Sequence, residues 1–376
     1  MSIMEITANF MAYLMKKKTT VIDNKVFQLY YCFTSPLLII LSALLTSKHL
    51  MGETIACATR QDGLHTNSLI SSYCLSSGTY TIRYKEDIES KLREYTREEK
   101  QFISRFGGIR QEIGQAHPGL GPSLPLVNYK VYHTTFSWVY IILIVQSLLF
   151  YIPIYFWKIV EGGKIKLCIQ NVPHPEDNNE IHIRKMNKMV HTYNKLKRDS
   201  NIYTIKYFIF EVLNLFILIG NGYINNLILQ KRFISLGLDI FSYYRNIDKL
   251  GDDNMFNNPL YDIFPTVTKC DFYIVSTVGQ IDNFDVMCHL PVNRLNEKIF
   301  IVIWYWFFIL SFLSVTSMIT ATVRIVLDGK MFGEKFMRQQ ISKNVDTVIF
   351  EEFTSKIPEL TIKDKKINAP SRYLDI

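Results

Sequence analysis

Four long apolar stretches alternate with polar stretches along the chain. Roughly 20 apolar residues form a helix long enough to cross the hydrocarbon core of a bilayer. The stretches of that length are residues 26–46, 136–157, 207–229 and 299–323. The pattern predicts an all-α polytopic membrane protein with four transmembrane helices. Pro36 lies in the middle of the first stretch and predicts a kink there.

The third stretch is the most polar of the four. It contains Glu211, Asn214 and Asn221, and its Gly-Asn-Gly sequence at 220–222 is expected to break the helix. Ionisable groups within a membrane usually face other protein or a water-filled cavity. Two interpretations stay open: a polar helix that faces the helical bundle, or polar side chains that face water in a conduction path.

Positive charge near the ends of the stretches predicts the orientation. Lysine and arginine gather before the first, after the second, before the third and after the fourth stretch. Because cytoplasmic loops carry this excess, we expect residues 1–25, 158–206 and 324–376 in the cytoplasm. The loops at 47–135 and 230–298 are then extracellular. The net charge of +8 is explained by these flanks, and no basic stripe with interleaved aromatics predicts a nucleic-acid partner.

Four of the six cysteines lie in the two loops assigned to the outside, as the pairs Cys57/Cys74 and Cys270/Cys288. Disulfides persist in that environment. Four cysteines allow three connectivities, and their spacing does not choose among them. No metal-ligand spacing, cofactor motif or catalytic motif accompanies them, so we expect no metal site, no cofactor and no enzyme. Cys32 and Cys168 are expected to stay reduced.

The first 24 residues are amphipathic. Ser2, Glu5 and Asn9 fall on one face at helical spacing, and apolar residues fall on another. The positive run at 16–18 follows the apolar part, which is the reverse of a secretory signal. One interpretation is a helix that lies on the membrane surface.

Short strings spread over nearly the whole chain carry a family resemblance. They are residues 22–27 (IDNKVF), 52–57 (GETIAC), 116–121 (AHPGLG), 150–153 (FYIP), 263–270 (IFPTVTKC) and 295–300 (LNEKIF). In their order and spacing, these strings resemble the innexins, the subunits of invertebrate gap junctions. Residues 135–139 (TFSWV) depart from the family's Tyr-Tyr-Gln-Trp-Val, and the first loop has an extra charged stretch near 84–113. With its short tail, the chain is similar to innexins carried by viruses of parasitoid wasps.

The resemblance implies a plasma-membrane subunit with a helical cytoplasmic dome that assembles as a ring of about eight copies, alone or with other innexins. Such a ring is a hemichannel that docks with an opposing hemichannel and passes ions and small molecules. A non-conducting adhesion protein, or a subunit that modifies other innexins, is the alternative. The basic helix expected near 181–206 is assigned to the dome, with a calmodulin site as its alternative.

The resemblance also implies roles for particular residues. It pairs Cys57 with Cys288 and Cys74 with Cys270, with pairing inside each loop as the alternative. It folds the N-terminal helix into the cytoplasmic mouth, where a ring of Glu5 carboxylates favours cations. The pore-lining candidates are Ser2, Glu5, Asn9, Met51, Gly52 and Glu53. Ordinary loop packing is the alternative for the last three.

Overall fold

The computed structural model describes residues 20–52, 54–58, 64–84, 119–120, 128–133, 138–174, 176–246, 258–275 and 279–367. The helices that precede the third span are α2 (Lys25–Gln28), η1 (Leu29–Thr34), α3 (Ser35–Met51), α4 (Leu64–Ser77), α7 (Val139–Glu161), α8 (Lys164–Ile169) and α9 (Asn179–Lys197). The later helices are α10 (Ser200–Ile228), α11 (Leu236–Arg245), α12 (Pro259–Ile263), α13 (Pro291–Asp328), η5 (Gly329–Met331), α14 (Phe332–Ser342) and α15 (Thr347–Ile367). The strands are β1 (Ala56–Ala58), β2 (Thr79–Tyr84), β3 (Asn128–His133), β4 (Val267–Val275) and β5 (Ile281–His289).

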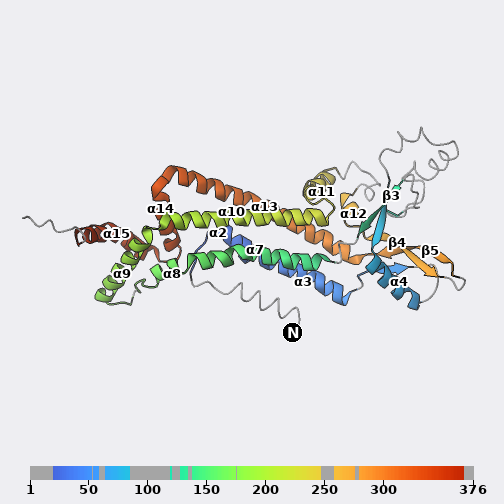
Figure 1. Ribbon diagram of the computed structural model, residues 1–376, viewed down its shortest axis with the longest axis horizontal. Helices are drawn as coiled ribbons and strands as arrows, with labels where there is room; N and C mark the ends of the chain where they lie inside the picture. The colour runs from blue at the N-terminus through green and yellow to red at the C-terminus, as the bar shows by residue number, and fades with distance from the viewer. Residues whose placement is uncertain are drawn as a thin grey trace, which may run out of the picture. The chain divides into compact units, whose positions relative to one another are not determined.

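Four helical stretches among the described residues are long and apolar enough to cross a membrane. They are Lys25–Met51, Val139–Glu161, Ser200–Ile228 and Pro291–Leu327, and α7, α10 and α13 are labelled in Figure 1. The first stretch is formed by α2, η1 and α3 in succession. This confirms the predicted class of a mainly helical four-span protein. The helices of the third and fourth spans begin before the apolar stretches because polar turns extend them.

The first span contains a π-helical turn directly before its proline. The turn occupies Leu29–Thr34, and Pro36 is the second residue of α3. A proline ring crowds the carbonyl group four residues earlier and offers that carbonyl no N–H donor. A π-helical turn widens the helix locally and is a known way to accommodate such a defect. The irregularity expected at Pro36 therefore lies in the turn that precedes it.

The helix break predicted at 220–222 is wrong, because α10 runs without interruption from Ser200 to Ile228. Each glycine in a helix interior costs about 1 kcal/mol relative to alanine. Breaking the helix costs more within a bilayer, where backbone groups have no water to bond. Asn221, between the two glycines, is buried.

The chain divides into two compact units, each of which we describe by itself. The terminal unit comprises the described parts of 1–37, 146–220 and 309–376, and the sheet unit comprises those of 38–145 and 221–308. The divisions fall within α3, α7, α10 and α13.

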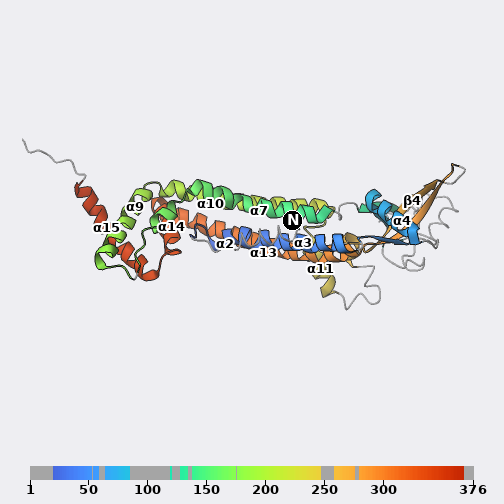
Figure 2. The ribbon, with the colours of Figure 1, turned by 90° about the horizontal axis from the view of Figure 1, so that it is seen from below.

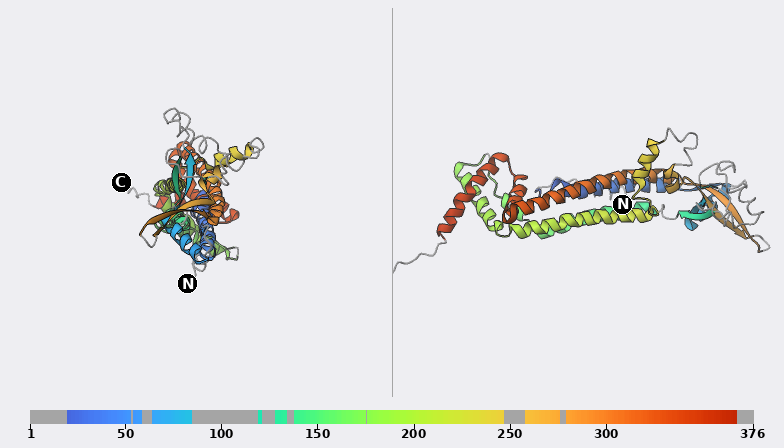
Figure 3. Two further views of the ribbon diagram at one scale, coloured as in Figure 1. Left: turned by 90° about the vertical axis from the view of Figure 1, so that its right-hand side faces the viewer. Right: turned by 90° about the horizontal axis from the view of Figure 1, so that it is seen from above.

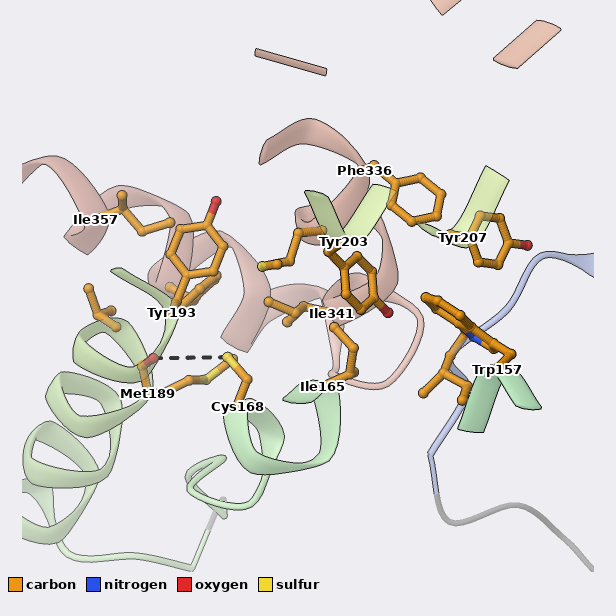
Figure 4. Packing of buried hydrophobic residues seen from close by; sticks show 14 of the residues in the cluster. Trp157, Ile165, Cys168, Met189, Tyr193, Tyr203, Tyr207, Phe336, Ile341 and Ile357 are labelled. Carbon is orange, nitrogen blue, oxygen red and sulfur yellow. Dashed lines mark hydrogen bonds between the residues drawn. The ribbon is translucent and has the colours of Figure 1, made fainter. Parts of the chain in front are cut away.

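The core of the terminal unit is rich in aromatic side chains. Figure 4 shows Trp157, Tyr203, Tyr207 and Phe336, which come from α7, α10 and α14. Helix α9 adds one buried face at helical spacing, formed by Met186, Met189, Val190 and Tyr193. Helix α15 crosses α9 and contacts it (Figure 3). These contacts bring α8, α9, α14 and α15 into one helical cluster, whereas the sequence predicted a helix near 181–206 and a tail at 324–376.

A tight turn connects α7 to α8. Gly162 and Gly163 have φ angles of 62° and 76°, in the left-handed region that favours glycine. The carboxylate of Glu161 is buried and accepts hydrogen bonds from the backbone N–H groups of Gly163 and Ile165, both at 2.7 Å. These bonds satisfy donors at the start of α8 that have no partner within the helix.

The sheet unit contains a five-stranded antiparallel sheet with the strand order β1-β5-β4-β2-β3. Strands β1, β2 and β3 come from the loop after the first span, whereas β4 and β5 come from the loop before the fourth. The two loops therefore form one sheet. Helix α4 lies against β1 and β4 (Figure 2). Between them lie Ile70, Phe272, Val286 and four cysteines.

Replacing Gly237 by alanine is expected to destabilise the sheet unit by about 1–3 kcal/mol. A Cβ atom at this position in α11 would lie 2.2 Å from Cζ3 of Trp304, whose indole N–H donates to the carbonyl of Ile234 at 3.2 Å. The thermal unfolding midpoint of the purified protein measures the effect. Gly220→Ala is the matched control, because nothing lies within 4 Å of its Cβ position. The argument fails if both variants unfold at the same temperature.

Candidate functional site

Two disulfides join the two loops in the sheet unit. Cys57 of β1 is bonded to Cys288 of β5, and these residues are also register partners in the sheet. Cys74 of α4 is bonded to Cys270 of β4. All four cysteines are buried. The bonds are those implied by the innexin resemblance, and neither bond lies within one loop.

The sulfur atoms of Cys57, Cys74 and Cys288 lie within 4.8 Å of one another, a spacing that suits a metal ion. Metal ions bind cysteine as the thiolate. Each of these sulfur atoms is already in a disulfide. The cluster therefore acts as a pair of covalent links between strands and helix.

A polar network crosses the sheet next to these links. Asp271 of β4 and Asp285 of β5 are register partners, an arrangement of like charges that is unfavourable by itself. The hydroxyl of Tyr80 donates to Asp271 at 2.6 Å and to Asp285 at 3.3 Å. Lys130 pairs with Asp271 at 2.5 Å, and Lys269 pairs with Asp285. Two lysines thus compensate the two carboxylates, and together with Tyr80 they connect β2, β3, β4 and β5.

The carboxyl of Asp271 gives this network a predicted dependence on pH. Burial acts to raise its pKa, but hydrogen bonds from Lys130 and Tyr80 outweigh burial and hold the pKa below its usual range. A group whose pKa is lowered on folding stabilises the protein above its unfolded pKa, about 3.9 for aspartate. That stability is lost as the pH falls through the lowered folded value.

We therefore expect about 1 kcal/mol of the sheet unit's stability to disappear as the pH falls below about 4. Unfolding midpoints of the wild type and of Asp271→Asn, compared at neutral and acid pH, measure this loss. The variant should be less stable at neutral pH, and the difference should shrink in acid. A difference that stays constant with pH would show that the charge of Asp271 contributes nothing.

In the terminal unit, the residues that precede the first span are held in place by side chains. Asn344 accepts a hydrogen bond from the N–H of Val21 at 2.6 Å and donates to its carbonyl at 2.7 Å. The indole N–H of Trp157 donates to the carbonyl of Ile22 at 3.3 Å. We call residues 21–24 the N-terminal tether, because they connect the first 20 residues to the bundle.

The rest of the tether is hydrogen-bonded, with Asp23 buried and Asn24 half-buried. The carboxylate of Asp23 accepts from the hydroxyl of Tyr31 at 2.6 Å and from the amide of Gln28 at 3.0 Å. The N–H of Asn24 donates to the hydroxyl of Tyr207 at 3.0 Å. Residues 21–24 are therefore held in position by α7, α10 and the residues around Asn344.

The pore-lining candidates lie at two places. Met51 is 86% exposed and Gly52 is exposed, at the C-terminal end of α3. Ser2, Glu5, Asn9 and Glu53 lie outside the described residues, as does most of the charged stretch near 84–113. In the third span, Glu211 is buried and accepts a hydrogen bond from Ser317 of α13 at 2.7 Å.

The sheet and its polar network were not predicted from the sequence. Strand β1 has three residues, and β2 pairs with strands that lie far away along the chain. A weak indication was present in residues 79–84 (TYTIRY), where every residue except Arg83 is aromatic or β-branched. Nothing in that pattern identifies Lys130 or Asp271 as partners of Tyr80.

Four candidate membrane spans, with two of the connecting loops joined in one disulfide-linked sheet, define a polytopic membrane protein. Comparison with known proteins specifies the family. The Innexin family model matches residues 23–356. Innexin inx2 of Schistocerca americana is 29% identical over 368 residues, 92% of this chain and 94% of that protein. Innexin inx2 of Drosophila melanogaster is 28% identical over 369 residues and 92% of each chain, and innexin inx3 of the same organism is 31% identical over 322 residues, 84% of this chain and 72% of that protein.

The chain belongs to the innexin family. Innexins are subunits of oligomeric gap-junction channels, so this chain is a multi-pass membrane protein of that kind. Exposed apolar side chains on the spans fit contact with lipid; examples are Leu44, Leu148, Phe216 and Phe312.

Proposed function

We propose that this chain forms a ring of about eight copies, alone or with other innexins, around an aqueous pore on the symmetry axis. Four helices have too few inner faces to enclose a wide pore, whereas a closed ring of subunits does so without strain. Both chain ends face the cytoplasm in this arrangement, because the positive charge near the span ends lies on that side. The sheet then faces outward.

The disulfide-linked sheet is the observation that carries the proposal. Docking of two rings requires rigid outer surfaces, because a flexible loop loses conformational entropy on contact. Two disulfides and five paired strands provide that rigidity. Tyr273 and Phe284 are exposed on the β4–β5 hairpin and offer apolar contacts to an opposing ring.

The N-terminal tether supports a role for the first residues in the pore. Its buried hydrogen bonds fix where the segment leaves the bundle. We assign Ser2, Glu5 and Asn9 to the pore surface at the cytoplasmic mouth. At the other end of the first span, we assign Met51, Gly52 and Glu53 to the outer part of the pore.

Electrical coupling between paired cells that lack other innexins tests the function. Cells that express this chain alone should be coupled and should show large-conductance currents. Absence of current and coupling in these cells, combined with altered coupling when another innexin is present, would instead identify a modulatory subunit.

A cysteine introduced at Met51 tests the pore assignment. A charged thiol reagent should reduce the current through Met51→Cys. Leu50→Cys is the matched control, because this neighbour is also exposed, at 72%, but points in another direction on the helix. Cys32 is replaced by serine in both variants because it is exposed, whereas Cys168 stays, since burial raises its pKa to about 12 and keeps it unreactive. Equal block of both variants would refute the assignment.

A further inference from the structure

A cavity of about 510 Å³ lies within the terminal unit, at one end of the candidate spans. Its volume is within the range of about 300–1,000 Å³ that is usual for sites of small molecules. Lys25 begins the first span, Thr204 lies near the start of α10, and Arg324 lies near the end of α13. These three helix ends meet the same side of the membrane. In the proposed orientation, this places the cavity near the cytoplasmic lipid headgroups.

The cavity is lined by converging positive charge. Lys25, Arg324, Lys335 and Lys343 line it from the start of the first span, from α13, and from α14 and the residue after it. Among the described lining residues, Glu211 is the single acid, and its carboxylate accepts a hydrogen bond from Ser317 at 2.7 Å. Basic side chains from four separate parts of the chain therefore converge on one cavity, an arrangement that favours an anionic ligand.

One of the four cations is held in place by neutral groups. The ammonium of Lys343 donates to the side-chain oxygen of Asn24 at 2.9 Å, to the amide oxygen of Gln340 at 3.2 Å and to the backbone carbonyl of Asp23 at 3.1 Å. These hydrogen bonds orient the ammonium and leave its formal charge in place. Its position next to the N-terminal tether also connects the cavity to the start of the first span.

Part of the remaining wall is apolar. Val26, Phe208, Ala321 and Phe332 line the cavity beside the charged groups. A ligand that fits this lining has several negative charges on one part and a less polar part next to them. Phosphate monoesters carry nearly two negative charges and three acceptor oxygens each, and both lysine and arginine bind them through charge-assisted hydrogen bonds. Basic pockets between spans at the cytoplasmic surface suit phosphorylated lipid headgroups.

We propose that this cavity binds a phosphorylated inositol headgroup, supplied either by a membrane phosphoinositide or by a free inositol polyphosphate. The site goes beyond the proposed channel function and rests on it only for the assignment of this end of the spans to the cytoplasmic side. Arg324 and Lys335 bind the phosphates, and the apolar wall contacts the part of the ligand that carries them.

Binding to the full-length protein tests the proposal in two arms. Titration calorimetry in detergent uses soluble inositol trisphosphate, and phosphatidylcholine nanodiscs use fluorescent phosphatidylinositol bisphosphate. Replacing both Arg324 and Lys335 by glutamine should weaken binding by about tenfold or more, since two charge-assisted contacts are lost. The matched control replaces Lys188 and Lys195 by glutamine, which removes the same charge from exposed positions of α9 outside the cavity.

A second variant keeps every charge. Thr320→Phe fills part of the cavity from α13 and should also weaken binding, so the test stands if the charge variant does not fold. The site is supported if binding is saturable in at least one arm and the cavity variants weaken it. The arm in which binding occurs identifies whether the ligand is the lipid or the free inositol phosphate. Absence of saturable binding in both arms overturns it, and so does an equal reduction by the control.

Conductance recorded from the same preparation separates this inference from the proposed function. A protein that binds the headgroup without conducting retains the site and contradicts the channel proposal. A protein that conducts without binding the headgroup supports the channel proposal and contradicts the binding site.

Discussion

Replacing Cys74 and Cys270 together by alanine is expected to lower the free energy of unfolding of the sheet unit by about 3–4 kcal/mol. With Cys57–Cys288 intact, this bond closes a short ring that runs through α4, β4 and β5. Its loss removes the covalent link between α4 and β4, and the helix is then held by the apolar contacts around Ile70 and by the hydrogen bond from the N–H of Cys57 to Ser71 at 3.1 Å. Alanine is used because serine would bury a hydroxyl group without a partner.

Removing Cys57–Cys288 after Cys74–Cys270 should lower the free energy of unfolding by more than removing Cys74–Cys270 did. Once Cys74–Cys270 is absent, Cys57–Cys288 alone constrains a sequence separation of 231 residues. In the chain-entropy account, the stabilisation grows with the logarithm of loop length, which adds about 1.6 kcal/mol here. Strictly additive losses would contradict the shared ring.

Unfolding midpoints of the purified protein, with and without reductant, measure these losses. Cell-to-cell coupling should disappear with the first pair, because the docking surface loses its fixed shape. Cys32→Ala is the control, since Cys32 is exposed and outside both disulfides, and it should unfold as the wild type does. Normal coupling in the absence of both disulfides would refute the role proposed for the sheet in docking.

Replacing Trp157 by alanine is expected to destabilise the terminal unit by about 3–5 kcal/mol. The indole ring is fully buried and lies 5.2–5.7 Å, between ring centroids, from Tyr203, Tyr207 and Phe210. Truncation leaves a large cavity in a core that is bounded by helices on several sides. The carbonyl of Ile22 also loses its donor.

Loss of the Trp157 side chain is also expected to loosen the N-terminal tether. Hydrogen exchange at residues 21–24 should become faster in Trp157→Ala, and single-channel recordings should show less stable open levels. Trp157→Phe is the matched variant, because it keeps most of the packing and loses the indole N–H. It should cost about 1 kcal/mol and still accelerate exchange near Ile22. Unchanged exchange in both variants would show that Trp157 does not hold the tether.

Sequence patterns predicted the elements whose stability depends on local composition. The four spans follow from apolar length, because hydrocarbon requires a continuous helix of that length. The helix expected near 181–206 corresponds to α9 (Asn179–Lys197) and the start of α10. The innexin resemblance implied the two disulfides, which the spacing of the cysteines alone left open.

Other features depend on residues that are far apart in the chain. The close approach of Gly237 to Trp304 sets the size limit at position 237, and no local pattern contains it. The pairing of Tyr80 with Asp271, and the convergence of Arg324 with Lys335 on Lys25, are of the same kind. The helix break expected from Gly220 and Gly222 was wrong. The destabilisation caused by each glycine is local and small, whereas every backbone N–H and C=O group along the span needs a hydrogen-bond partner.

The sequence by itself determined that this chain crosses the membrane four times and, through its motifs, that it resembles the innexins. Both conclusions rest on properties that neighbouring residues carry together. The tertiary structure decided that the two cysteine-bearing loops form one sheet, that α7 and the Asn344 region hold the N-terminal tether, and that basic residues from separate helices line one cavity. Those arrangements result from contacts between distant segments, whose free energies depend on packing and hydrogen-bond geometry that exist only in the folded chain.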